Sequence, residues 1–193
     1  MTNLDRGFKG WVERAAVSIR RELGLSGHEA LEPVRLAEYL EIRLMVPDEV
    51  PGVTQEILDQ LLRHDPSGWS AVSVGLDHNA IIIYNPEHSK GRQASDIMHE
   101  LAHFILDHKP GTLIVSQYGD MVMRSYDAKQ EEEANYLAWG LLLPREALVF
   151  ARKLGLTPGQ IAKRHGVSEP LVKFRMNLTG VNRQFSKARG RQS

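Results

Sequence analysis

Two histidines four residues apart, in the run His99-Glu100-Leu101-Ala102-His103, constrain the fold of this chain more than any other feature. On an α-helix, positions i and i+4 lie one above the other, so both imidazoles can reach a single metal ion. Glu100 flanks the same face, where its carboxylate can take a proton from a water molecule at the ion. These requirements predict a helix, which we place over residues 93–108, before the helix-breaking run Lys109-Pro110-Gly111.

This helix is predicted to be amphipathic. Five polar residues fall within an arc of about 100° on a helical wheel: Asp96, His99, Glu100, His103 and Asp107. The opposite side consists of the apolar residues Ile97, Met98, Leu101, Phe104 and Ile105. Such a helix can bury one face in a core and turn the other to a cleft. A plain amphipathic helix with two solvated histidines has the same periodicity, so a metal site needs support from a further ligand.

A catalytic metal site needs a third protein ligand. The chain has no cysteine, which excludes thiolate ligands, disulfides and cysteine nucleophiles. A longer histidine motif is also excluded, because Lys109 stands where that motif requires its third histidine. A carboxylate from a second helix remains, and we predict this helix over residues 127–143 with Asp127 as its N-cap. Zinc is the ion that we expect for such a site.

The run Glu131-Glu132-Glu133 offers three carboxylates in the second helix. Glu131 shares its face with Asn135 and with small alanines, so this face can approach the first helix closely. We therefore predict Glu131 as the third ligand and Asn135 beside a ligand imidazole, with Asp96 as a further neighbour of the ligands. Glu133 points about 160° away from Glu131 and is the alternative ligand. We interpret Glu132 and Glu133 as charges that complement the helix N-terminus.

The rest of the pattern predicts an α+β fold with a small antiparallel or mixed sheet, because short strands precede a series of helices without βαβ alternation. We expect helices over residues 11–23, 33–39 and 54–63, and strands over residues 43–46, 69–76 and 80–84. Residues 77–79 would form the hairpin between the last two strands. In the third helix, apolar residues that include Ile57 are expected on the inner face.

The formal charge of zero hides an uneven distribution. From Arg152 onward the chain has ten Lys/Arg and one Asp/Glu, against 14 and 23 in the residues before it. We predict a domain over residues 1–150, a basic helix-turn-helix-like segment of two short helices over residues 151–183, and a flexible tail over residues 184–193. The balance as a whole argues against a chain that binds nucleic acid along its entire surface.

The basic segment has the spacing of a helix-turn-helix. Ala162 is small enough for two helices to meet, Gly166 suits the turn, and Val172 follows six residues later. Its cations, Arg175 among them, are expected on the outside, where they can contact DNA phosphates. Two alternatives stay open: a structural helix pair with a solvated basic surface, and docking onto the acidic residues 1–150.

Nothing in the sequence predicts a membrane partner. No apolar run approaches the roughly 18–20 residues of a spanning helix. The first ten residues lack the apolar core of a secretory signal. Together with the absence of cysteine, these observations lead us to expect a cytoplasmic protein.

The two motifs also carry a family resemblance. The run His99-Glu100-Leu101-Ala102-His103-Phe104, followed by EEEANYLAWGLLLP from Glu131 to Pro144, resembles the ImmA/IrrE family of metallopeptidases. The family pattern is H-E-L-x-H and then E-x-x-A-N/D-x-F-A-x-x-L-L-M-P. Leu137 and Leu143 replace the usual Phe and Met, and Ser95-Asp96 stands where Phe-Thr is common.

This resemblance implies a zincin-like fold and a zinc-dependent endopeptidase, with His99, His103 and Glu131 as metal ligands and Glu100 as general base. The implied substrate is a protein regulator, such as a helix-turn-helix repressor. An edge strand, over residues 69–75 or 80–84, would hold the substrate as an added strand.

A group besides the metal usually stabilises the oxyanion. Tyr118, Tyr126 and His108 are candidates, and nothing in the sequence chooses among them. Two other functions compete with the peptidase: a DNA-binding regulator whose metal site senses or stabilises, and an interaction module that has lost turnover. Glu100 favours the enzyme, because a structural zinc site does not need a carboxylate at that position.

Overall fold

The computed structural model describes residues 4–74, 80–108, 113–115, 122–124 and 127–189. Its first part contains α1 (Phe8–Glu22), α2 (Pro33–Tyr39), β1 (Arg43–Met45), the 3-10 turn η1 (Pro47–Glu49), α3 (Gln55–Asp59) and the π-helical turn η2 (Gln60–His64). Next come β2 (Ala71–Val74), β3 (Ile81–Tyr84), α4 (Lys90–Ile105), β4 (Leu113–Val115) and β5 (Val122–Arg124). The C-terminal part contains α5 (Ala128–Leu142), α6 (Arg145–Lys153), α7 (Pro158–His165), α8 (Glu169–Leu178) and α9 (Val181–Arg189).

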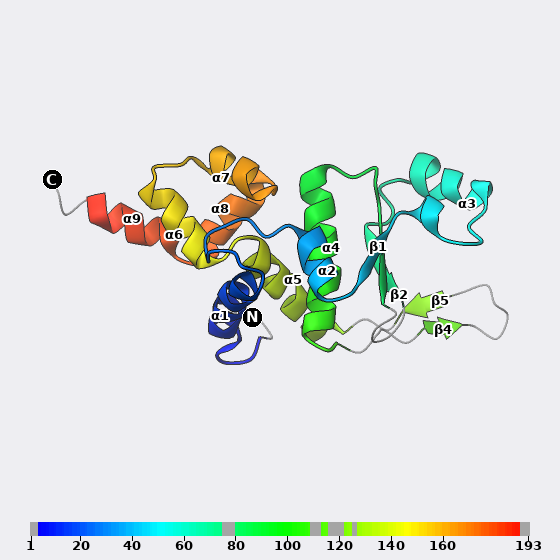
Figure 1. The fold of residues 1–193 in the computed structure, drawn as a ribbon, viewed down its shortest axis with the longest axis horizontal. Coiled ribbons are helices and arrows are strands. Elements are labelled where there is room, and N and C mark those ends of the chain that lie inside the picture. The colour runs from blue at the N-terminus through cyan, green and yellow to red at the C-terminus, as the bar shows by residue number, and fades with distance from the viewer. Residues whose placement is uncertain (1–3, 75–79, 109–112, 116–121, 125–126, 190–193) are drawn as a thin grey trace.

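A three-stranded mixed sheet lies on one side of α4, and α5 lies on the other side (Figure 1). β3 is the central strand: β1 pairs with it in parallel and β2 pairs with it antiparallel, so Leu44 and Ser73 both lie opposite the buried Ile82. The small sheet followed by helices confirms the predicted α+β fold. The predicted hairpin turn, residues 77–79, lies outside the described residues. β4 and β5 form a separate antiparallel pair.

The two helices predicted to build the site both form. α4 begins at Lys90, three residues before the predicted start, and Leu106 is its C-cap. α5 begins where the Asp127 carboxylate accepts hydrogen bonds from two main-chain N–H groups of the first turn, as predicted for an N-cap. The two helices pack through apolar residues, all buried: Ile97, Met98, Leu101 and Ala102 of α4, and Ala134, Leu137, Ala138 and Leu141 of α5.

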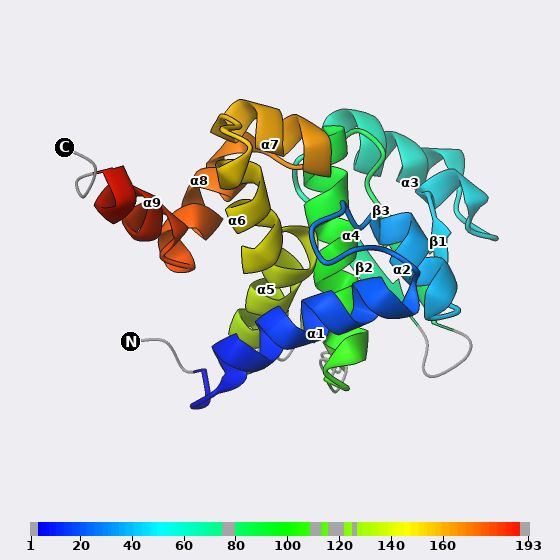
Figure 2. The same ribbon diagram turned by 60° about the vertical axis from the view of Figure 1, so that its left-hand side comes forward.

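Helix α1 packs closely against α5 (Figure 2). At Gly140 a methyl group in place of the hydrogen would collide with the side chain of Val12, so the approach requires glycine. Nearby, Arg20 is fully buried and donates hydrogen bonds to three main-chain oxygens, those of Ala16, Glu29 and Leu141. Burial lowers the pKa of Arg20 to about 10. The guanidinium therefore satisfies one carbonyl at the C-terminal end of α5, that of Leu141, where the last carbonyls lack partners within the helix.

Helices α6 to α9 lie on the side of α5 away from the sheet (Figure 1). We predicted two short helices in the basic segment, but it contains α7, α8, the start of α9 and the end of α6. α6 runs across residue 150, and the buried cluster around α4 and α5 extends into α7, α8 and α9 through Ile161, Val172, Met176 and Val181. α9 reaches Arg189, so most of the tail expected to be flexible is helical. Residues 190–193 lie outside the described residues.

The helix-turn-helix prediction is confirmed for α7 and α8. Gly166 ends α7 with a positive φ of 64°, and Ala162 and Val172 are both buried between the elements. The predicted position of Arg175 was wrong. Its side chain is fully buried, its Nε donates to the carbonyl of Leu143, and its Nη2 donates to the carboxylate of Glu13.

The predicted inner position of Ile57 in the third helix was also wrong, whereas Leu58, Leu61 and Leu62 of the same face are half-buried. Thr54 caps α3 by accepting a hydrogen bond from the Ile57 main-chain N–H, but no residue of α3 or η2 is buried and the side chain of Ile57 is 46% exposed. The apolar spacing is helical, yet among the described residues nothing covers the side chain of Ile57 enough to bury it. Within the part of the chain that the structure describes, no helix is both long and apolar enough to cross a bilayer.

Candidate metal centre

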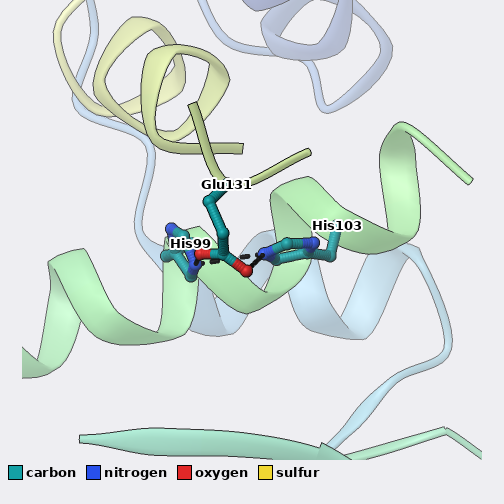
Figure 3. A group of neighbouring side chains, drawn as sticks. All are labelled: His99, His103 and Glu131. Carbon is teal, nitrogen blue, oxygen red and sulfur yellow. Dashed lines mark hydrogen bonds and ion pairs between the residues drawn. The ribbon is translucent and has the colours of Figure 1, made fainter. Parts of the chain in front are cut away.

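Three side chains from α4 and α5 converge on one point (Figure 3). The Nε2 atoms of His99 and His103 lie 3.1 Å apart. The two carboxylate oxygens of Glu131 complete the group, with Oε2 lying 3.2 Å from His99 Nε2 and Oε1 lying 3.5 Å from His103 Nε2. One turn of α4 sets the two rings side by side, and the packing of α5 on α4 brings the carboxylate over them.

This geometry fits a tetrahedral zinc ion. Zinc bonds to nitrogen or oxygen of about 2.0–2.1 Å place neighbouring donors about 3.3–3.4 Å apart. The three measured separations, from 3.1 to 3.5 Å, bracket that value. Two imidazoles and one carboxylate are also a donor set that catalytic zinc sites use. The two separations that involve Glu131 use different oxygens, and one donor atom of each residue lies within 4.8 Å of the others, so the three residues could hold a metal ion.

Of the three consecutive glutamates, Glu131 is the one that reaches both imidazoles. Glu133, the alternative ligand, lies elsewhere: its Oε2 is 3.3 Å from Nε2 of His108. The structure thus brings together His99, His103 and Glu131 and keeps Glu133 outside the group.

Glu100 lines a pocket of about 400 Å³ next to the three donors. Residues of the sheet, of α4 and of α5 all line the pocket. They are Ser70 and Ala71 at the start of β2, Ser95, Asp96, His99 and Glu100 of α4, and Glu131, Asn135, Ala138 and Trp139 of α5. The carboxylate at position i+1 therefore faces the same space as the candidate metal ligands. A molecule in the pocket would meet both.

Asn135 and Asp96, which we predicted to lie near the ligands, also line this pocket. Asn135 Nδ2 donates to the main-chain oxygen of Glu131 over 2.8 Å, and so holds the helix turn rather than an imidazole. Asp96 Oδ2 lies 2.9 Å from Nδ1 of His88 and 3.8 Å from Nε of Arg92. Both residues fix the walls of the pocket.

Of the three candidate oxyanion stabilisers, only His108 belongs to the described residues, and Tyr118 and Tyr126 lie outside them. The side chain of His108 is 8% exposed, and its Nδ1 is 3.0 Å from Nδ1 of His103. It therefore contacts the side of the His103 ring opposite the nitrogen that meets Glu131. Its ring nitrogens point to His103 and Glu133. This contact is one that the sequence did not reveal.

A comparison with protein families matches residues 59–177, more than half of the chain, to a peptidase family described as the IrrE N-terminal-like domain. The chain belongs to this family. The match confirms the resemblance seen in the two motifs. It includes α4 and α5, which carry the three donors and Glu100.

Among solved structures, this IrrE-like chain is similar to a Mycobacterium tuberculosis transcriptional regulator, with a TM-score of 0.53 and 18% sequence identity. The similarity covers 86% of this chain and 46% of the regulator, so the chain spans less than half the length of that protein. At this identity the likeness supports the α+β, zincin-like fold alone. A comparison with curated proteins gives no match.

One aromatic residue, Trp139, lines the pocket in this IrrE-like domain. Trp139 lies two turns beyond Glu131 on α5, which is about 12 Å along the helix. Phe174 of α8 packs edge-to-face on Trp139, with ring centroids 4.8 Å apart, and its side chain remains 43% exposed. The helix-turn-helix-like segment thus contributes an apolar group next to the pocket.

Proposed function

We propose that this chain is a zinc-dependent endopeptidase of narrow specificity, which cleaves a regulatory protein such as a helix-turn-helix repressor. The single observation that carries the proposal is the convergence of His99, His103 and Glu131, two of which line the same pocket as Glu100. An ordinary amphipathic helix would not place a carboxylate of another helix within 3.5 Å of both imidazoles.

The residues divide into those that hold the metal and one that moves a proton. His99, His103 and Glu131 would hold zinc, which when bound polarises a peptide carbonyl and makes a water molecule more acidic. Glu100 is placed to take the proton from the attacking water and to return it to the leaving amine. Glu100 is needed for turnover and not for metal binding.

An extended substrate can add to the sheet along β2. In the strand order β1-β3-β2, the central strand β3 already has a partner on each side, whereas β2 is at the edge. Ser70 and Ala71, at the start of β2, line the pocket that contains Glu100. Of the two strands suggested by the sequence, β2 is therefore the one that can bind a peptide as an added strand. The aromatic pair of Trp139 and Phe174 would then favour a bulky apolar side chain on the substrate.

The choice of a regulatory protein as substrate, and of the cytoplasm as location, is supported by family resemblance and by sequence composition. The similar solved structure is that of a transcriptional regulator. Neither the family nor this similarity names a substrate of the present chain. Both choices are parts of the proposal.

A paired measurement on wild type and Glu100→Gln tests the proposal. Metal analysis should find about one zinc per chain in both proteins. Candidate repressors should be cleaved by wild type, and at least about 100-fold more slowly by the variant, because a general base contributes this much or more. Wild type that contains no zinc and binds none when zinc is added would contradict the proposal.

The alternative function, a DNA-binding regulator, has less support in the fold. On α8, Arg175 is buried, Lys173 is paired with Glu169, and Phe174 lies on Trp139. Exposed cations remain at Lys163 and Arg164 of α7. Titration of duplex DNA at two salt concentrations tests this function: a wild-type affinity that is tight, falls with salt and is lost in Lys163→Ala/Arg164→Ala would favour the regulator.

A further inference from the structure

Three partly buried side chains form a continuous line behind the candidate metal ligands. Nδ1 of His103 lies 3.0 Å from Nδ1 of His108, and Nε2 of His108 lies 3.3 Å from Oε2 of Glu133. The side chains of His108 and Glu133 are 8% and 15% exposed. None of these contacts is needed to bring His99, His103 and Glu131 together, so the line requires its own explanation.

The main chain after α4 turns back and places His108 against His103. α4 ends at Leu106, and Asp107 then takes a left-handed conformation with φ of 51°. This turn folds the chain back, so that the main-chain N–H of His108 donates to the main-chain oxygen of His103 over 3.0 Å. A left-handed conformation is uncommon for a residue other than glycine. Two separate contacts, one of the main chain and one of the rings, thus join the same two residues.

The positions of the hydrogens follow from the chemistry of the three groups. A carboxylate accepts hydrogen bonds and does not donate, so Nε2 of His108 carries the hydrogen that points at Glu133. In a neutral imidazole the other nitrogen, Nδ1, is then an acceptor. With both rings neutral, Nδ1 of His103 is the donor in its 3.0 Å contact with Nδ1 of His108. Nε2 of His103 is then the nitrogen that carries the lone pair of the ring, on the side that faces His99 and Glu131.

We propose that His108 and Glu133 are positioning residues, which fix the ring orientation and tautomer of His103 so that its Nε2 is ready to bind the metal. The inference rests on the proposed function, since it takes His103 to be a metal ligand. Metal-bound histidines commonly donate their second N–H to a carboxylate or a carbonyl. Here His108 lies between the candidate ligand His103 and the carboxylate of Glu133. Its contact with Glu133 fixes the ring of His108, and its contact with His103 then fixes the ring of His103.

The far end of the line is anchored as well. Oε1 of Glu133 is 3.8 Å from Nζ of Lys129, which in turn lies 3.0 Å from Oδ2 of Asp5. Lys129 and Asp5 are exposed, so these contacts are weaker than the buried ones. The contact with Lys129 involves Oε1 of Glu133, while Oε2 is the oxygen that meets His108. The orientation of His103 is therefore set from α5, the same helix that supplies Glu131.

Zinc affinity of the full chain, measured by competition with a chelator, tests the inference. His108→Phe removes both hydrogen bonds and should weaken zinc binding by about 10- to 100-fold. His108→Asn keeps an acceptor for His103 and should lose less, whereas Glu133→Gln should fall between the two. Glu132→Gln, a neighbouring change of the same kind on α5, is the matched control and should stay within about 2-fold of wild type.

A second readout separates positioning from a general loss of stability. With cobalt in place of zinc, the visible absorption spectrum reports the ligand geometry, and it should shift in His108→Phe and Glu133→Gln but not in Glu132→Gln. The melting temperature of the metal-free proteins identifies a variant that fails to fold, and the remaining variants then decide the question. Zinc affinities within about 2-fold of wild type for folded His108→Asn, His108→Phe and Glu133→Gln would overturn the inference. Wild type without zinc binding would instead contradict the proposed function.

Discussion

The Glu13 carboxylate on α1 lies 2.7 Å from Nη2 of Arg175 on α8, so a residue near the start of the chain holds a buried guanidinium 162 positions later. The other oxygen of Glu13 accepts a hydrogen bond from the main-chain N–H of Arg145, the first residue of α6, over 2.7 Å. One carboxylate therefore ties together α1, α6 and α8. The basic segment is joined to the rest of the fold by buried charge as well as by apolar contacts.

Replacing Arg175 by Ala should destabilise the fold by about 3–5 kcal/mol, because it leaves the partly buried Glu13 without its charged partner. The free energy of unfolding, obtained from urea titration, checks this value. Lys173→Ala is the matched control: Lys173 pairs with Glu169 at the surface, and its loss should cost about 0.5 kcal/mol or less. Equal unfolding midpoints for the two variants would show that the Arg175 contacts contribute little.

Glu131→Ala should abolish stoichiometric zinc binding, because it removes one of three protein donors. Glu133→Ala should still bind one zinc per chain at saturating metal, although more weakly than wild type. Equilibrium dialysis followed by metal analysis distinguishes the two variants. The opposite pattern would make Glu133 the third ligand.

Phe174→Ala should weaken cleavage of a substrate that places an apolar side chain against Trp139. An aromatic contact of this kind contributes about 0.5–1.5 kcal/mol, which corresponds to about a 2- to 10-fold rise in KM. Zinc content should stay the same. Leu154→Ala serves as the control, because Leu154 is also an exposed apolar residue of the C-terminal helices. If both variants cleave like wild type, the aromatic pair has no part in substrate binding.

His165 should make the fold less stable in acid. Burial, followed by the nearby charges of Arg20 and Arg164, lowers its pKa from 6.5 to about 4. Between these values the unfolded chain binds a proton that the folded chain does not, so the free energy of unfolding falls as the pH drops from about 6.5 to about 4. The contribution of this residue is about 3 kcal/mol over that range.

The pH dependence can be assigned to His165 by substitution. His165→Leu should show a smaller loss of stability between pH 6.5 and pH 4 than wild type, measured as the free energy of unfolding at each pH. His64→Leu changes an exposed histidine and should leave the slope unaltered. A slope in His165→Leu that matches wild type would assign the acid sensitivity to other groups.

The sequence predicted those features that depend on neighbouring positions along the chain. Asp127 caps α5 and Gly166 ends α7 because a short carboxylate and a left-handed glycine act within one helical turn. The pairing of His99 with His103 follows from helical spacing in the same way. Glu131 required one further step, namely a close approach of two helices, and the small residues around it indicated that approach.

Features that depend on long-range packing were not predictable from the sequence. Arg175 resembles its solvated basic neighbours until α1 places Glu13 beside it. His108 and Glu133 are brought together by the left-handed turn at Asp107 and by the packing of α5 on α4. Ile57 has regular apolar spacing, yet it is exposed among the residues that the structure describes. Local periodicity indicates which face is apolar, but it does not indicate whether a partner is present.

The edge position of β2 has a consequence for the behaviour of the protein in solution. A strand edge that accepts a peptide can also accept the same strand of another copy, and such edges are common sites of aggregation. β2 has four residues, and Val74 at its end is half exposed. So short a strand offers few hydrogen bonds, which makes a pair of edges weak without further contacts. If the proposed substrate adds to β2, this short edge would hold it while offering little to a second copy.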